Sequence, residues 1–257
     1  MNSIKWKSAY DLTVGGLAWP PSDLESIFDR LPQYAKATVP QDVWNQSIKA
    51  AGVYVEFTTD STDLYVSYNL NSTDIDFWNM AASGVSSVDI LGFDDESGVF
   101  RWMGTYPAPS CENNGSLLTG LTRTTKYRMY LPPYNRVVSL SVGVSDKATY
   151  FGKIDEDPKP VPFIWYGSSI AQGKAAMIPS TTFITQVALR MYPVLELLNF
   201  GFSSSCHMDE SVLDVFHTIK VVKGYIIDCL PNMNASMVED LTIPLVNNIR
   251  AARGLSI

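Results

Sequence analysis

The sequence predicts two different folds in succession, a β-sandwich followed by an α/β domain with a parallel sheet. Short strands that alternate apolar and polar residues, with turn signals between them, run from about Val53 to Val144. From Phe163 onward, strands alternate with helical patterns instead. The charged, proline-rich segment Gly152–Pro162 lies between the two patterns and is expected to be a linker. The expected boundaries are residues 1–151 for the sandwich, 152–162 for the linker and 163–257 for the α/β domain.

The composition is that of a folded, acidic protein. Of the 257 residues, 46% are hydrophobic and 18% are charged, which excludes a disordered or collagen-like chain. The formal net charge is −7 and the sequence pI is about 4.8, so the basic surface that binds nucleic acid or anionic lipid is not expected. No window approaches the run of about 18 apolar residues needed to span a bilayer.

The start of the chain and its cysteines favour an intracellular location. Residues 1–8 lack the apolar region of a secretory signal. The three cysteines, Cys111, Cys206 and Cys229, form neither an even disulfide framework nor a close-spaced metal-binding pattern. A reducing compartment is the simpler interpretation. No metal or other cofactor is expected, because no phosphate-binding glycine loop, zinc spacing or calcium-binding loop occurs.

The all-β part is predicted from six strand-like segments. They are Val53–Thr58, Leu64–Leu70, Ser87–Phe93, Val99–Gly104, Lys126–Leu131 and Val137–Val144. Strands this short, with no helical pattern between them, are typical of a β-sandwich or jelly roll. The aromatic residues of this part are expected to fill the sandwich core, and a sugar-binding face is the alternative.

The α/β part contains three strand-like and three helical segments in strict alternation. The strands are Phe163–Tyr166, Glu196–Phe200 and Tyr225–Asp228, and the helices are Thr182–Met191, Glu210–Ile219 and Met237–Arg253. This order implies a parallel sheet with right-handed crossovers. In such sheets, chemistry takes place beyond the carboxyl ends of the strands. A polar cluster follows each strand, at Tyr166–Gly173, Asn199–Asp209 and Asp228–Asn234.

These clusters resemble the sequence blocks of the SGNH (GDSL) serine hydrolases, in particular the branch with an N-terminal jelly-roll domain. The blocks read Tyr-Gly-Ser-Ser-Ile-Ala-Gln-Gly from Tyr166, Asn-Phe-Gly-Phe-Ser-Ser-Ser from Asn199 and Asp-Cys-Leu-Pro-Asn-Met from Asp228. The first half matches through Arg30-Leu-Pro, Val43-Trp-Asn and Tyr130-Leu-Pro-Pro-Tyr-Asn. The resemblance therefore covers nearly the whole chain. It implies a flavodoxin-like α/β domain and the cleavage of carboxylic esters.

The resemblance implies roles for three residues. Ser169 matches the nucleophile, and its own N–H is expected to face the oxyanion. Asn232 matches the asparagine whose side-chain amide donates to that oxyanion, and such a donor is worth roughly 2.7–4 kcal/mol. Ser204 stands where the family has glycine, so its N–H can serve as a third donor only if a β-carbon fits the turn.

The general base is the feature that departs most from the family. A serine hydroxyl is a poor nucleophile unless a base takes its proton, and the family supplies that base from a C-terminal Asp-x-x-His block. No such block occurs up to Ile257, and Leu255–Ile257 look like the start of a fourth strand, so the α/β domain is expected to be truncated. His207 is a possible substitute base, whereas His217 is expected to be a structural cation near a helix C-terminus. A thiol nucleophile at Cys206 or Cys229 is not expected.

Two classes of function remain open at this stage. The first is a carboxylic-ester hydrolase, an acetylesterase acting on a small acyl or sugar ester. The second is a catalytically inactive relative that serves as a structural or interaction subunit of a larger assembly. In either case the unfinished sheet predicts association with a second polypeptide that completes it, or with another copy of the chain. A sugar-binding module built on the sandwich alone has less support.

Overall fold

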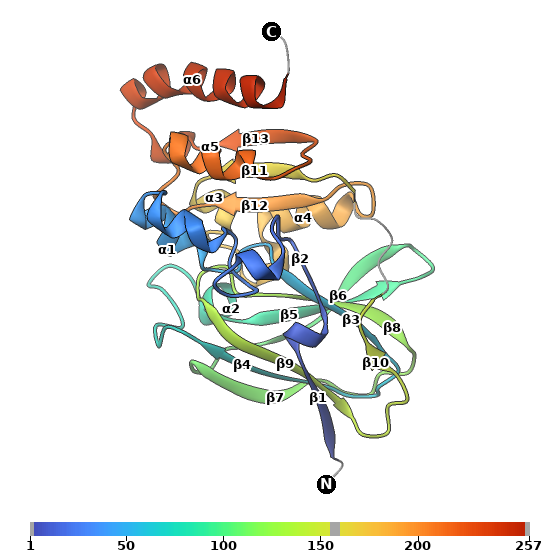
Figure 1. Cartoon of the computed structure of the whole chain (residues 1–257). Coiled ribbons are helices and arrows are strands. Elements are labelled where there is room, and N and C mark those ends of the chain that lie inside the picture. The colour runs from blue at the N-terminus through green and yellow to red at the C-terminus, as the bar shows by residue number, and fades with distance from the viewer. Residues whose placement is uncertain (1–2, 155–159, 255–257) are drawn as a thin grey trace.

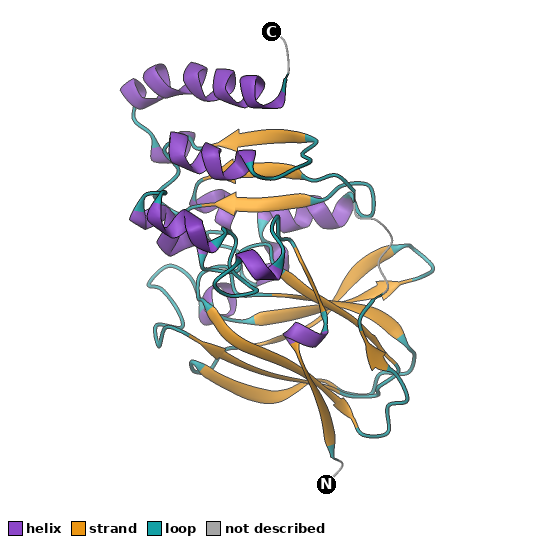
Figure 2. Ribbon diagram, in the orientation of Figure 1, coloured by secondary structure: helices purple, strands orange, loops and turns teal. Residues whose placement is uncertain are grey.

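The computed structural model describes residues 3–154 and 160–254. Two layered parts lie one above the other in the view of Figure 1, with antiparallel strands below and a small parallel sheet flanked by helices above. Figure 2 shows that most of the regular helix lies in the upper part. The described chain ends lie at opposite extremes of the molecule. No helix within the described residues is long and apolar enough to cross a membrane.

The lower part is a β-sandwich of two antiparallel sheets. One sheet has the order β1 (Ile4–Ser8), β9 (Val137–Ser145), β4 (Leu64–Leu70) and β7 (Glu112–Leu118). The other has the order β10 (Phe151–Gly152), β3 (Tyr54–Thr59), β8 (Thr125–Tyr130), β5 (Val88–Asp94) and β6 (Val99–Tyr106), with β2 (Thr13–Gly15) beside β3. The short helices of this part are η1 (Ala9–Asp11), η2 (Pro21–Asp23), η3 (Gln33–Ala37), α1 (Gln41–Ser47) and α2 (Ala82–Val85).

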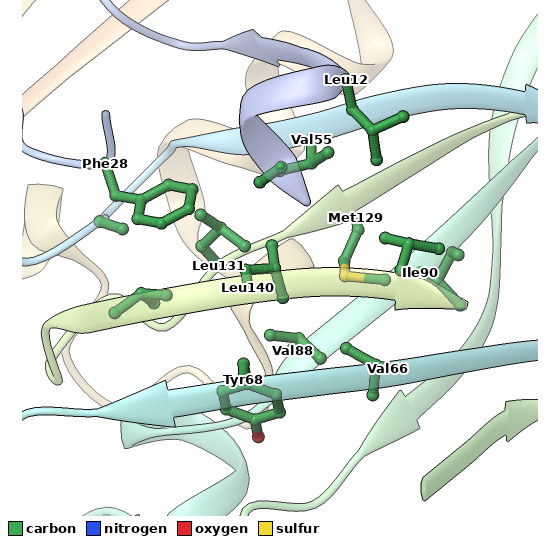
Figure 3. Packing of buried hydrophobic residues seen from close by; sticks show 14 of the residues in the cluster. Leu12, Phe28, Val55, Val66, Tyr68, Val88, Ile90, Met129, Leu131 and Leu140 are labelled. Atoms are coloured by element: carbon green, nitrogen blue, oxygen red, sulfur yellow. The ribbon is translucent and has the colours of Figure 1, made fainter. Parts of the chain in front are cut away.

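The sandwich core follows from the alternation of apolar residues along its strands. Val66 and Tyr68 of β4 are fully buried while Ser67 between them is only partly so, as a period of two requires. Figure 3 shows these two side chains beside Val88 and Leu140, which come from other strands. The ring of Phe57 is also fully buried. The predicted β-sandwich with an aromatic core is therefore confirmed.

The upper part is a three-stranded parallel sheet with the order β12-β11-β13. Its strands are β11 (Phe163–Gly167), β12 (Leu197–Gly201) and β13 (Gly224–Asp228), and its helices are α3 (Ser169–Gln172), η4 (Pro179–Thr181), α4 (Phe183–Arg190), α5 (Glu210–His217), η5 (Leu230–Asn232) and α6 (Ala235–Arg253). One face of the sheet, with Tyr166 and Phe200, packs against α5 and α6. The other face, with Trp165 and Ile226, packs with residues of α3 and α4. The predicted parallel α/β fold is confirmed.

Four strands of the sandwich were not predicted, namely β1, β2, β7 and β10. Strand β7 contains Asn113, Asn114 and Gly115, which have low strand propensity, and it forms because it pairs with the edge of β4. Gly152, the first residue of the expected linker, belongs to β10, which pairs with β3. Residues 155–159 of that linker, and the fourth strand expected at Leu255–Ile257, lie outside the described residues.

Arg30 joins the two parts of the molecule. Its side chain is 1% exposed, and its guanidinium donates to the carbonyls of Gln46 (2.7 Å) and Lys49 (2.7 Å) in the first part. The same group donates to the carbonyls of Asn199 (2.9 Å) and Gly201 (2.8 Å) on β12. Among the described residues β12 pairs only with β11, and these two carbonyls belong to its other edge. The arginine therefore satisfies an edge that would otherwise be open to association.

A second buried contact joins β5 to η4. The carboxylate of Asp89 is fully buried and accepts hydrogen bonds from the backbone N–H of Ser180 at 3.0 and 3.3 Å. Burial raises the pKa of Asp89 to about 7, although the hydrogen bonds from Ser180 oppose the shift. The folded protein therefore holds a proton on this carboxyl at pH values where an unfolded chain does not.

We expect Arg30→Met to lower the free energy of unfolding by about 3 kcal/mol, because several charge-assisted hydrogen bonds are lost and buried carbonyls are left without donors. Arg250→Met, at an exposed position of α6, is the matched control and should cost less than about 1 kcal/mol. Urea denaturation of both variants measures the difference. Equal losses would show that Arg30 does not hold the two parts together.

We expect protonation of Asp89 to contribute to the pH dependence of the free energy of unfolding. Because its pKa is raised from 3.8 to about 7 on folding, the folded state binds the extra proton, and stability falls as the pH rises from about 4 to about 7. Asp89→Asn should reduce this decrease in the free energy of unfolding by at most about 4 kcal/mol. Asp74→Asn, at an exposed position, should leave the decrease unchanged. Denaturation series at several pH values test this, and an unchanged slope in Asp89→Asn would contradict it.

Candidate active site

The carboxyl ends of the three parallel strands are tied together by hydrogen bonds. The N–H of Phe202, after β12, donates to the carbonyl of Gly167 at 2.7 Å, and the N–H of Ser168, after β11, donates to the carbonyl of Asp228 at 3.0 Å. The ends of β11, β12 and β13 therefore meet at one edge of the sheet. After β11 the chain forms β12 on one side of it and then β13 on the other side. α/β sheets bind ligands at the carboxyl ends of the strands where the chain changes sides in this way.

Ser169 is the first residue of α3, directly after β11. Its neighbour Ser168 caps the helix, because the Ser168 hydroxyl accepts a hydrogen bond from the N–H of Ile170 at 3.3 Å. Ser169 is half-buried, and its carbonyl accepts a hydrogen bond from the Tyr134 hydroxyl at 3.1 Å. Helix α3 lies close to β12, since a β-carbon on Gly201 would overlap the backbone of Gln172. The nucleophile candidate is thus held by neighbours from both parts of the molecule.

Gln172 links the turn after β12 to the sandwich. Its side chain is fully buried and donates to the carbonyl of Pro133 at 3.0 Å and to the side chain of Gln46 at 3.2 Å. Its Oε1 accepts a hydrogen bond from the N–H of Ser203 at 2.8 Å. A buried amide that is bonded on both sides fixes its neighbours firmly. The turn containing Ser204 therefore has a defined position relative to α3.

Ser204 adopts the left-handed backbone conformation, with a φ of +60°. This is the conformation that glycine adopts without strain and that L-residues with a β-carbon disfavour. The turn closes through the N–H of Ser205, which donates to the carbonyl of Phe202 at 3.0 Å. The side chain of Ser204 is exposed, so its β-carbon has room. The turn after β12 therefore has, at Ser204, the backbone conformation that glycine favours.

Asn232 lies in η5, after β13. Its Oδ1 accepts a hydrogen bond from the N–H of Cys206 at 3.4 Å, which orients the amide and leaves its NH2 group to donate. Cys206 also forms a disulfide with Cys229 at the end of β13. The sequence, in which three cysteines form no even framework, did not predict this disulfide. A separation of 23 residues gave no pairing signal in the sequence, and only the folding of both turns to the same edge brings the sulfurs together.

Two titratable groups near the strand ends, Tyr134 and Asp228, have raised pKa values. Burial raises the pKa of the Tyr134 phenol to about 12, so the phenol stays protonated as the donor to Ser169. Burial also raises the pKa of Asp228, the last residue of β13. No cluster of three or more candidate metal ligands occurs among the described residues.

The two histidines have different surroundings. His207 lines a cavity of about 440 Å³ between α5 and α6, together with Asp209 and Met237, and no hydrogen bond to Ser169 is formed. His217 ends α5, as expected, but burial and the nearby charge of Arg253 lower its pKa. A helix C-terminus favours a cation, whereas burial here favours the neutral imidazole.

Three residues that hold the site were not assigned a role in it from the sequence. Tyr134 and Arg30 belong to sequence blocks that carried the resemblance in the first half, and Gln46 follows another such block closely. Their partners lie between 35 and 171 residues away. The match of these blocks to the family was the signal in the sequence that could have pointed to them. Local sequence patterns do not reveal contacts between residues so far apart.

Comparison with known proteins gives two family matches. The model described as the N-terminus of SGNH-hydrolase-type esterases matches residues 4–150. The model of the GDSL-like lipase/acylhydrolase family matches residues 159–255. No curated protein matches the sequence significantly.

Solved structures share the fold at low sequence identity. A protein described as a GDSL-like lipase from Bacteroides ovatus superimposes with a TM-score of 0.89 at 23% identity, over 98% of this chain and 72% of the other. The salicylyl-acyltransferase SsfX3 of a tetracycline biosynthetic pathway gives 0.68 at 18% identity, over 98% and 72%. A family two carbohydrate esterase from Cellvibrio japonicus gives 0.55 at 9% identity, over 100% and 78%.

The left-handed conformation of Ser204 predicts that glycine at this position gives a more stable protein than valine. Ser204→Val should lower the free energy of unfolding by about 1–2 kcal/mol, because a β-branched residue is disfavoured at positive φ. Ser204→Gly should leave it unchanged or raise it by less than about 1 kcal/mol. At Ser139, exposed on β9, the order should reverse, since strands prefer valine to glycine. Thermal denaturation of the four variants measures both orders, and the same order at both sites would contradict the turn geometry.

Proposed function

The chain belongs to the SGNH-hydrolase-type esterases, and on this premise we propose that it hydrolyses carboxylic esters with Ser169 as the nucleophile. The hydroxyl of Ser169 attacks the acyl carbon, and the carbonyl oxygen becomes an oxyanion. The N–H groups of Ser169 and Ser204 and the side-chain amide of Asn232 donate to that oxyanion. The alcohol then leaves with a proton, and water hydrolyses the acyl-enzyme.

One observation carries this proposal. The N–H of Cys206 donates to the oxygen of the Asn232 amide, which orients the amide and leaves its NH2 group free to donate to a ligand. The left-handed turn at Ser204 supports the second donor, because the family has glycine there. Donors fixed before the reaction stabilise the developing charge without having to reorganise.

We propose further that the proton acceptor for Ser169 comes from another segment, carrying an Asp-x-x-His block, that pairs with β13. Within the described residues β13 has a single neighbouring strand, β11. All five residues of β13 are only half-buried, whereas all five residues of β12 are buried. This contrast supports an additional strand at β13, since central strands of parallel sheets are buried on both faces. His207 remains a less favoured alternative base.

A non-catalytic subunit is the second candidate function. It is favoured by the absence, among the described residues, of a histidine hydrogen-bonded to Ser169. The proposed substrates of the catalytic form are small acyl esters, acetyl esters of sugars included. The carbohydrate esterase among the structural neighbours is consistent with this class, although its 9% identity supports the fold alone.

Labelling with a fluorophosphonate, which reacts with activated serines, separates the two candidates. We expect slow labelling of this chain and at least a hundredfold faster labelling after co-expression with a segment carrying Asp-x-x-His, the usual contribution of a general base being about 10²–10⁴-fold. Ser169→Ala should abolish the label, and Ser203→Ala should retain it. A chain that labels slowly with every such segment would be the non-catalytic subunit, and fast labelling of the chain alone would favour His207.

A further inference from the structure

A two-residue hairpin after β4 presents a single tryptophan to solvent. Phe77 and Met80 exchange backbone hydrogen bonds at 2.9 and 3.1 Å, so Trp78 and Asn79 form the tip. Trp78 is 96% exposed, more than any other large hydrophobic residue of the described chain. The base of the hairpin is ordered by packing, since Met80 is 5% exposed and lies in one cluster with Phe77 and Tyr134. The packed base of the hairpin thus keeps the Trp78 side chain exposed to solvent, and Trp78 does not contribute to the core.

This hairpin lies beside the nucleophile candidate. The ring of Phe77 packs edge-on against the ring of Tyr134, with centroids 5.8 Å apart, and the Tyr134 hydroxyl donates to the Ser169 carbonyl. Lys174, from the turn after α3, places its Nζ 5.7 Å from the centroid of Phe77. In Figure 1 the carboxyl ends of β11, β12 and β13 and the end of β4 point to the same side of the molecule. Trp78 therefore directly follows Phe77, whose ring packs against Tyr134, and Tyr134 donates to the carbonyl of the candidate nucleophile Ser169.

Other exposed apolar side chains come from the segments around Ser169. Ile170, the next residue of α3, is 52% exposed, and Met177, in the loop after it, is 77% exposed. Single exposed apolar residues are ordinary on protein surfaces. Here they accompany an unburied indole and the exposed polar side chains of Asp76 and Asn79. A flat apolar face with carboxylate and amide groups beside it suits a sugar ring, which presents C–H bonds on its face and hydroxyls at its rim.

We propose that Trp78 is a specificity-determining residue, on which the sugar ring of an ester substrate stacks while its acyl group lies at Ser169. The inference rests on the proposed function, because it assigns the substrate class of the same site. It gives the sandwich domain a direct role in substrate recognition. A ring-free ester gains nothing from the indole, so the preference for a cyclic alcohol should depend on this side chain.

Binding measured without turnover tests the proposal. In a Ser169→Ala background, titration calorimetry compares monoacetylated xylobiose with glycerol monoacetate, which has hydroxyls but no ring. Trp78→Ala should weaken binding of the xylobiose ester about fivefold to tenfold, the effect of losing one aromatic contact, and Trp78→Phe should restore part of it. Glycerol monoacetate should bind the variants equally. Trp102→Ala, which removes a tryptophan that is 57% exposed on β6, is the matched control and should change neither affinity.

The outcomes separate this inference from the proposed function. Equal affinity of the Trp78→Ala variant and its parent for the xylobiose ester would overturn the role of Trp78, whatever the chain hydrolyses. An equal loss for both esters would also overturn it, since the effect would not depend on the ring. If the tryptophan-dependent preference is present but no ester is hydrolysed in any combination of segments, the binding role stands and the catalytic proposal fails.

Discussion

The arrangement of the molecule depends on one buried guanidinium. Arg30 carries its charge where burial lowers its pKa to about 9, and it is tolerated there because four backbone carbonyls accept its hydrogen bonds. Two of these carbonyls belong to the outer edge of β12, so the arginine takes the place that another strand would occupy. The sandwich thereby closes one edge of the parallel sheet and sets the position of β12.

The same joint reaches the candidate active site. Ser204 lies in the turn that follows β12. This turn is positioned by β12, which precedes it, and by the buried amide of Gln172, which accepts a hydrogen bond from the N–H of Ser203. Gln172 in turn is bonded to Pro133 and Gln46 of the first part of the chain. Tyr134 completes the connection by donating to the carbonyl of Ser169. The first domain is therefore hydrogen-bonded directly to the segments that carry the candidate site residues.

Local sequence patterns predicted most of the fold. The features that were not predicted depend on contacts between residues far apart in the sequence. Strand β4 was predicted with its observed bounds, because its alternation and flanking turns are unambiguous. Strand β7 was missed, because its asparagines and glycine oppose the strand that pairing imposes. Ser169, Ser204 and Asn232 were proposed as site residues from a family resemblance and from the rule that strand ends carry chemistry. The disulfide of Cys206 was missed, since its partner is near only in the folded chain.

The most direct test of this account is a crystal structure of the chain soaked with methylboronic acid, which adds to serine hydroxyls as a tetrahedral anion. The account predicts boron bonded to the Oγ of Ser169. It also predicts that one boronate oxygen lies about 2.7–3.1 Å from both the N–H of Ser204 and the side-chain amide of Asn232. A boronate bound to another residue, or one whose oxygens all face solvent away from these donors, would contradict the account.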